Sequence, residues 1–124
     1  MKLTDLAIGD LILINNTPHK IQAIDSIDAE ILADDDLYYV GEDRCHSEDK
    51  IEPIPLTPEI LEKNGWWYVS DDMWQHEEVG FYIEKWNGRF QCYDINDIKL
   101  DSVHQLQQTL RLCGLNQLAD NFKV

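Results

Sequence analysis

Three observations indicate that this sequence has an α+β fold. Short apolar or alternating runs, spaced about ten residues apart, fill the first part of the chain and are typical of a strand meander or small barrel. A proline-rich step then leads into a helix, and an Asn-Gly pair further on separates two alternating runs. We therefore expect a small β-rich unit over residues 1–56 and an α+β unit of helix, three strands and helix over residues 57–124, sharing one core.

The first unit is predicted to be a small antiparallel, barrel-like structure. The glycine-aspartate entry, the strand after it and the tight turn resemble the start of a Src-homology-3-like or KOW-like barrel, a likeness of fold that says little about function. In the second strand Ile21 faces inward, followed by Ala23 or, if a bulge intervenes, by Ile24. After one turn at 3–6, strands are expected over Leu11–Ile14, His19–Ile24, Ile27–Leu32 and Leu37–Val40, with turns at 15–18, 25–26 and 34–36 and a loop over 41–50.

The proline-rich step changes from strand to helix for local reasons. Its first two prolines restrict residues 51–54 to a short or edge strand. Thr57 can cap a helix that has a proline at its first position, and Gly65 can adopt the left-handed conformation that ends one. The sequence therefore predicts a helix over Pro58–Asn64 and an aromatic strand over Trp66–Val69.

The Asn-Gly pair at 87–88 is the strongest hairpin signal in the chain, because a tight primed turn needs positive φ at both positions. The predicted strands are Val79–Trp86 and Arg89–Ile95. In the first of them one face carries Phe81, Ile83 and Lys85, and the other carries Tyr82, Glu84 and Trp86.

The closing helix is predicted from a capping box formed by Ser102 and Gln105. Gly114 ends this helix, and residues 115–122 can add a further turn. We expect the helix to cover the aromatic strands with one apolar stripe, made of Val103, Leu106, Leu110 and Cys113 and widened by Leu112.

The net charge of −14 is the clearest global property. Such a field repels phosphate backbones, so nucleic-acid binding is not expected. The acidity either keeps the protein soluble, or forms a face that meets a basic partner or mimics nucleic acid. No apolar run approaches a membrane helix and no signal peptide is recognisable, so we expect a cytoplasmic protein. Three widely spaced cysteines, Cys45, Cys92 and Cys113, indicate reduced thiols, the last two in the core.

No motif for catalysis or cofactor binding is recognisable, so we expect no enzyme, no cofactor and no metal site. The histidines, His19, His46, His76 and His104, lack zinc-ligand spacing. The acidic runs at 34–36 and 71–72 are interpreted as solvated turns, because no calcium-loop pattern surrounds them.

The aromatic residues between positions 66 and 93 are the most informative anomaly. One helix cannot cover both faces of their sheet, so some rings should stay accessible. Tryptophan and tyrosine anchor interfaces and stack on flat ligands. The predicted binding residues are Trp66, Trp67, Trp74, Tyr82, Trp86, Arg89 and His104.

Two segments, 50–66 and 103–115, resemble a family of small uncharacterised proteins of Bacteroides-type gut bacteria, their prophages and mobile elements. The resemblance implies a phage or mobile-element context in a bacterial cytoplasm and supplies no catalytic residue. The first hypothesis is a non-enzymatic interaction protein that binds a host protein, with counter-defence as a role. The alternative is a pocket protein that sequesters a small ligand such as a signalling nucleotide. A homo-oligomer is left open.

Overall fold

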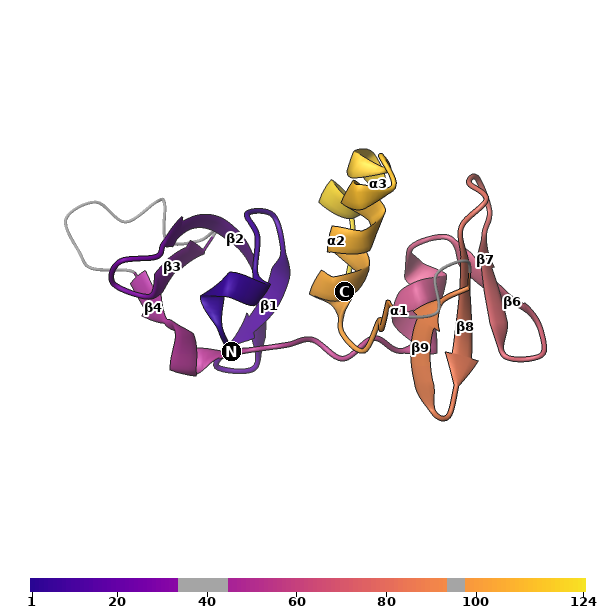
Figure 1. Cartoon of the computed structure of the whole chain (residues 1–124), viewed down its shortest axis with the longest axis horizontal. Helices are drawn as coiled ribbons and strands as arrows, with labels where there is room; N and C mark the ends of the chain where they lie inside the picture. The colour runs from indigo at the N-terminus through magenta and orange to yellow at the C-terminus, as the bar shows by residue number, and fades with distance from the viewer. Residues whose placement is uncertain (34–44, 94–97) are drawn as a thin grey trace.

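Two antiparallel sheets and three α-helices make up the computed structural model, which describes residues 1–33, 45–93 and 98–124 (Figure 1). The two sheets lie at opposite ends of the molecule and α2 stands between them (Figure 1). This architecture confirms the predicted α+β class. The elements are η1 (Leu3–Asp5), β1 (Leu11–Ile14), β2 (Thr17–Asp25), β3 (Glu30–Ala33), β4 (Cys45–Ser47), η3 (Glu48–Lys50), β5 (Ile51–Glu52), α1 (Pro58–Lys63), β6 (Trp66–Ser70), β7 (Met73–His76), β8 (Tyr82–Trp86), β9 (Arg89–Cys92), α2 (Val103–Leu112) and α3 (Asn116–Asp120).

The N-terminal sheet has the strand order β4-β3-β2-β1-β5, with antiparallel neighbours throughout. Within the described part of the chain, no pairing of β4 with β5 closes it into a barrel. The predicted barrel-like closure is therefore not confirmed, and the likeness to a Src-homology-3 fold stays a prediction. The expected turn at 34–36 and the strand Leu37–Val40 lie outside the described residues.

Two predicted strand boundaries in this sheet are wrong because the turns differ in length from those expected. Asn15 and Asn16 alone make the first turn, with φ of 52° and 63°, so β2 already begins at Thr17. The second turn is longer, because Asp25 Oδ1 accepts hydrogen bonds from the next turn amides, including that of Ile27 at 3.0 Å. Ile27 is consequently exposed in a turn, and β3 starts at Glu30.

The expected loop over 41–50 is also wrong for its last six residues, since β4 pairs with β3 and η3 follows it. The bulge in β2 is confirmed: the register shifts between Ile21 and Ala23, and Ile24 packs against the core. The edge position of β5 is confirmed as well.

Strand β1 is buried on both faces, which explains its continuous apolar sequence. Ile12 and Ile14 pack into the core of the N-terminal sheet. Leu11 and Leu13 point the other way and join the larger core shared with α2 and the second sheet. One strand therefore connects the two cores.

The second sheet has the order β6-β7-β8-β9 and contains one strand more than expected. The missed strand is β7, which follows a two-residue turn at Asp71 and Asp72 with φ of 54° and 57°. The Asn87-Gly88 hairpin is confirmed, with φ of 51° and 77°. The helix α1 is also confirmed, capped by Thr57 Oγ1, which accepts a hydrogen bond from the Ile60 amide at 3.2 Å.

We expect Gly88→Val to lower the free energy of unfolding by about 1–3 kcal/mol, the usual cost of strained backbone. A Cβ at this position would meet no atom within 4 Å, so the cost comes from the positive φ alone. Chemical denaturation measures it. Gly80→Val is the matched control, because Gly80 also has free space around it but no positive φ. Equal unfolding midpoints for the two variants would contradict the turn assignment.

Helix α2 is buried on two sides, one apolar and one polar. Its apolar side places Val103, Leu106 and Leu110 in the large core, as predicted. The capping box is present. Cys113 and Leu112 correct the prediction: Cys113 ends the helix and is exposed, and Leu112 is exposed and does not widen the apolar stripe. Cys92 is buried, as expected. The other side of α2 faces the N-terminal unit through polar side chains, which the apolar pattern did not predict.

No helix in the described ranges is long and apolar enough to span a lipid bilayer.

Candidate functional site

The second sheet has one face packed against helices and one open face. Strand alternation sends Trp74, Ile83 and Cys92 to the inner face, where they pack with α2. Their neighbours in sequence point to the opposite side. We call that side the outer face, made of Trp67, Met73, Gln75, Tyr82, Glu84, Trp86, Arg89, Gln91 and Tyr93.

A row of side chains crosses the outer face from strand to strand. Trp67 is opposite Gln75, Gln75 is opposite Tyr82, and the Tyr93 amide donates to the Tyr82 carbonyl at 3.1 Å. The Tyr82 and Tyr93 ring centroids are 6.1 Å apart. Trp67 is 59% exposed and Tyr93 47%, while Tyr82 is half-buried. Further along β8, Trp86 is 64% exposed. Aromatic surface is thus spread over a face that no described element covers.

Two of the predicted binding residues belong to the core and correct the prediction. Trp66 and Trp74 are 2% and 5% exposed. The Trp66 ring meets His76 edge-on at 4.6 Å between centroids, and the Trp74 ring meets Phe90 at 5.3 Å. Adjacent tryptophans on a strand point to opposite faces, so only Trp67 of the Trp66-Trp67 pair reaches solvent.

Arg89 lies at the rim of the outer face, opposite Trp86 across the hairpin. Its guanidinium forms a two-point contact with the Asp101 carboxylate. The hydrogen bond to Asp101 raises the pKa of Arg89, and the same bond lowers the pKa of Asp101. Arg89 therefore joins the sheet to the segment before α2 and is already paired in this structure.

The seventh predicted residue, His104, lies in a different place. It lines a groove of about 820 Å³ between the N-terminal unit and the start of α2. Its Nδ1 is 3.1 Å from Ser102 Oγ. Burial lowers the pKa of His104, and the nearby Asp10 and Asp5 carboxylates oppose that shift. The groove wall is acidic, with Asp5, Asp49, Glu52 and Asp101 among its lining residues.

We expect His104 to make stability depend on pH. Its folded pKa lies below the unfolded value of about 6.5, so the unfolded chain binds the proton first as the pH falls. The contribution to stability is complete above about pH 6.5 and is lost as the pH drops toward the folded pKa. Urea unfolding of the parent and of His104→Gln at about pH 7.5 and about pH 5.5 checks this. Between the higher and the lower pH, the parent should lose more unfolding free energy than His104→Gln. Equal losses in the two proteins would contradict the prediction.

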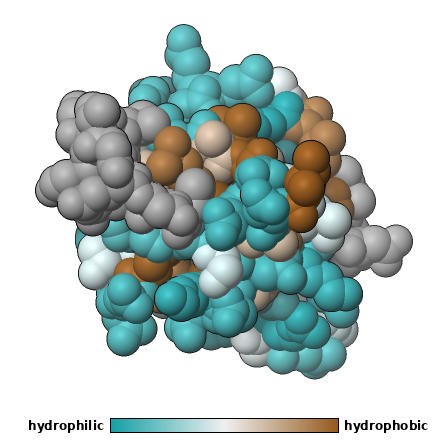
Figure 2. All heavy atoms as spheres, turned by 90° about the vertical axis from the view of Figure 1, so that its left-hand side faces the viewer, coloured by the Kyte–Doolittle hydropathy of each residue, from teal (hydrophilic) through white to brown (hydrophobic). Residues whose placement is uncertain are grey.

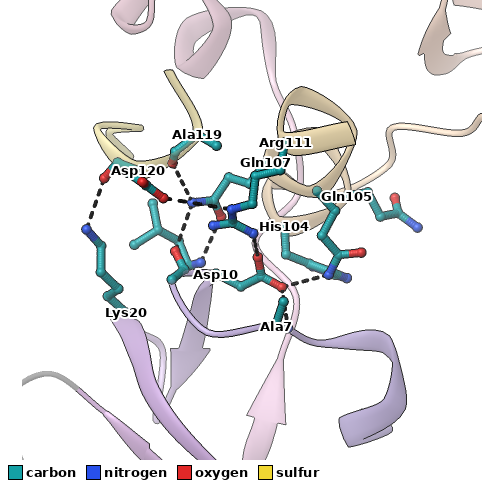
Figure 3. A network of polar contacts seen from close by, with 12 residues as sticks. Ala7, Asp10, Lys20, His104, Gln105, Gln107, Arg111, Ala119 and Asp120 are labelled. Carbon is teal, nitrogen blue, oxygen red and sulfur yellow. Dashed lines mark hydrogen bonds and ion pairs between the residues drawn. The ribbon is translucent and has the colours of Figure 1, made fainter. Parts of the chain in front are cut away.

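A buried polar network joins α2 to the N-terminal unit (Figure 3). Asp10 is completely buried, and its Oδ1 accepts from Arg111 Nη1 at 2.7 Å. Asp10 Oδ2 accepts from the Ala7 amide at 2.9 Å and from Gln108 Nε2 at 2.7 Å. Gln107, also completely buried, accepts from the Leu11 amide at 2.8 Å.

This network is the main feature that sequence reasoning missed. Gln107 Nε2 also donates to the carbonyls of Gly9 and Ala119, at 3.1 and 3.0 Å, so one side chain connects β1, α2 and α3. Several of its hydrogen bonds join residues about a hundred positions apart in the sequence, and we therefore interpret it as a structural junction. Among the residues that the structure describes, no group of three or more His, Cys, Asp or Glu side chains could hold a metal ion.

Of the seven predicted residues, the structure thus brings Trp67, Tyr82, Trp86 and Arg89 to one open face. Tyr93 is the outer-face aromatic that the predicted set lacks; its pairing with Tyr82 could have been read from the hairpin register. Figure 2, which faces the end formed by the N-terminal sheet, shows mainly hydrophilic surface with separate apolar patches.

No match to this chain was found among protein-family models, curated proteins or solved structures.

Proposed function

We propose that this is a non-enzymatic interaction protein that binds another protein through the outer face of its second sheet. The observation that carries the proposal is the row Trp67-Gln75-Tyr82-Tyr93 together with Trp86, left uncovered by the described residues. Exposed aromatic patches of this kind mark interaction sites, and Trp and Tyr are the residues that most often dominate binding energy.

Charge narrows the class of partner. The chain carries a net charge of −14, so a basic or neutral protein surface is favoured over an acidic one or a nucleic acid. The resemblance to proteins of bacterial mobile elements suggests that the partner is a host protein in the bacterial cytoplasm. The role of the binding would then be counter-defence. We also propose that the N-terminal unit has a Src-homology-3-like fold.

The second candidate function is the sequestering of a small ligand, and the groove beside His104 is the observation that favours it. The acidic lining of that groove repels phosphate, so a cationic or neutral ligand fits it better than a nucleotide. If this function holds, native mass spectrometry of the protein purified from bacterial cells should show a bound small molecule.

The test of the first function is affinity capture from a bacterial lysate with quantitative mass spectrometry. The baits are the parent, Trp67→Ser, Trp86→Ser and the control Ile27→Ser, which removes an even more exposed apolar side chain in the N-terminal unit. A partner should be retained by the parent and the control and weakened about thirtyfold or more by each tryptophan variant, the loss typical of an aromatic hot spot. If no retained protein depends on Trp67 or Trp86, the proposal fails.

A further inference from the structure

Strand β6 is the outer edge of the second sheet, at the end of the molecule farthest from the N-terminal sheet (Figure 1). The Glu77 amide donates to the Gly65 carbonyl at 2.8 Å, which fixes which β6 residues bond to β7. Backbone groups on an antiparallel strand alternate in direction. Trp67 therefore bonds to Gln75, and the amide and carbonyl of Tyr68 point away from the sheet. Among the described residues, no turn, loop or cap hydrogen bond engages that outward pair.

This edge carries neither proline nor charge, two of the features that natural proteins use to block strand addition, although the register of β6 shifts between Tyr68 and Ser70, so the regular part of the edge is Trp66–Tyr68. The sequence of β6 is Trp-Trp-Tyr-Val-Ser, with no proline and no charge. Trp67, Tyr68 and Val69 are each at least half exposed. The strand thus combines an unpaired backbone with apolar side chains on both of its faces.

Acidic side chains lie at both ends of this edge. Asp71 and Asp72 form the exposed turn after β6, and the exposed Glu77 and Glu78 lie beside its beginning at Gly65. Residues 57–80 contain a single basic residue, Lys63, and six acidic ones: Glu59, Glu62, Asp71, Asp72, Glu77 and Glu78.

We propose that β6 accepts an added β-strand from another protein, an extended segment that is apolar in its middle and carries Lys or Arg at its ends. Strand addition would satisfy the Tyr68 backbone, and the side chains of the added strand would continue the row on the outer face. The basic ends follow from the carboxylates at both ends of β6. A second copy of this chain fits less well, because it would bring the same acidic turn and a further net charge of −14 to the edge.

This inference rests on the proposed function and specifies how the partner binds. A random peptide-display library of about twelve-residue inserts, selected against the whole chain, is the probe, since a strand of that length spans β6 with both flanks. Enriched peptides should alternate apolar residues between basic ends. Their binding should fall at least tenfold with Tyr68→Pro, which removes the outward amide at a position where an edge strand tolerates proline.

The matched control is Tyr68→Thr, which removes the ring but keeps the amide and should bind within about threefold of the parent, since ring loss alone leaves the backbone pairing intact. Should Tyr68→Pro fold poorly, Val69→Lys supplies a second block, because a lysine there repels the basic peptide and guards the edge. Amide hydrogen exchange gives an independent readout. The peptide should protect the Tyr68 amide and leave that of Trp67, already bonded to Gln75, unchanged.

No enrichment, enrichment of peptides without basic residues, or binding that survives both blocking variants would overturn the proposal. So would a parent that sediments as a dimer and becomes monomeric with Tyr68→Pro, which would assign the edge to a second copy. If a partner is lost with Trp67→Ser but retained with Tyr68→Pro, the outer face binds without strand addition, and the proposed function stands alone.

Discussion

Replacing Asp10 with alanine should lower the free energy of unfolding by about 3–5 kcal/mol, as the loss of one partner of a buried ion pair typically does. The substitution removes the acceptor of Arg111 Nη1 and of the Ala7 amide, and one of the two acceptors of Gln108 Nε2, at a partly buried site. Unmet donors of this kind carry their own desolvation cost. Chemical denaturation followed by tryptophan fluorescence measures the loss.

Asp120→Ala is the control, because Asp120 is exposed and lies 3.8 Å from the same arginine. An exposed pair of this kind contributes at most about 1 kcal/mol. The double variant Asp10→Ala, Arg111→Met should lose less unfolding free energy than the two single variants lose in total, since it removes both charges together. A loss below about 1 kcal/mol for Asp10→Ala would show that water reaches the network.

Leu110→Ala should cost about 2–5 kcal/mol through the cavity it leaves. Leu110 is completely buried and packs in the core shared by α2, β1 and the second sheet. A helix of this length is marginal in water by itself, so its stability depends on burying that side. The same loss should appear at every protein concentration, because the contact is within one chain.

Leu112→Ala is the matched control on the same helix, since Leu112 is 83% exposed and its loss should change stability by less than about 0.5 kcal/mol. Sedimentation of parent and Leu110→Ala over about a hundredfold dilution tests the intramolecular assignment. A dimeric parent and a folded, monomeric variant would show that this side of α2 packs against a second copy.

Elements whose signals are local could be predicted well from the sequence. The cap at Thr57, the turn at Asn87-Gly88 and the box at Ser102 each depend on a few adjacent residues. These determine their own backbone with little help from the rest of the molecule. The helix over Pro58–Lys63 was consequently predicted nearly to the residue. The second hairpin was predicted correctly at its turn, but β8 begins at Tyr82 instead of the expected Val79, and β9 ends at Cys92.

Strand β7 could not be recognised in the same way. Its turn uses Asp71 and Asp72, which adopt positive φ less readily than Asn-Gly and also occur in solvated loops. Met73–His76 then alternates between partly and fully buried side chains, and two of the four residues are polar. Its strand character comes from pairing with β6 and β8, which a single sequence does not reveal.

The outer face was predicted in part for a similar reason. Composition indicated that some aromatic rings stay exposed, but the face of each ring depends on register. Trp66 and Trp67 are adjacent and chemically identical, yet the first is buried and the second exposed, because they lie on opposite faces of the sheet. The polar side of α2 was harder still, because Gln107 and Arg111 find their partners about a hundred residues earlier, at Leu11 and Asp10.

The position of α2 between the sheets also has a consequence during translation. Both sheets leave the ribosome before α2, yet each needs it, the first to cover Leu11 and the second to cover Ile83. At roughly 5–20 residues per second, the interval between Cys92 and Leu112 lasts on the order of one to four seconds. During that time only α1 and the segments before it can cover the inner face of the second sheet, and chaperones that recognise nascent apolar segments can reach the part that α2 later buries. We expect the form of this protein most exposed to aggregation in a cell to be the unfinished chain.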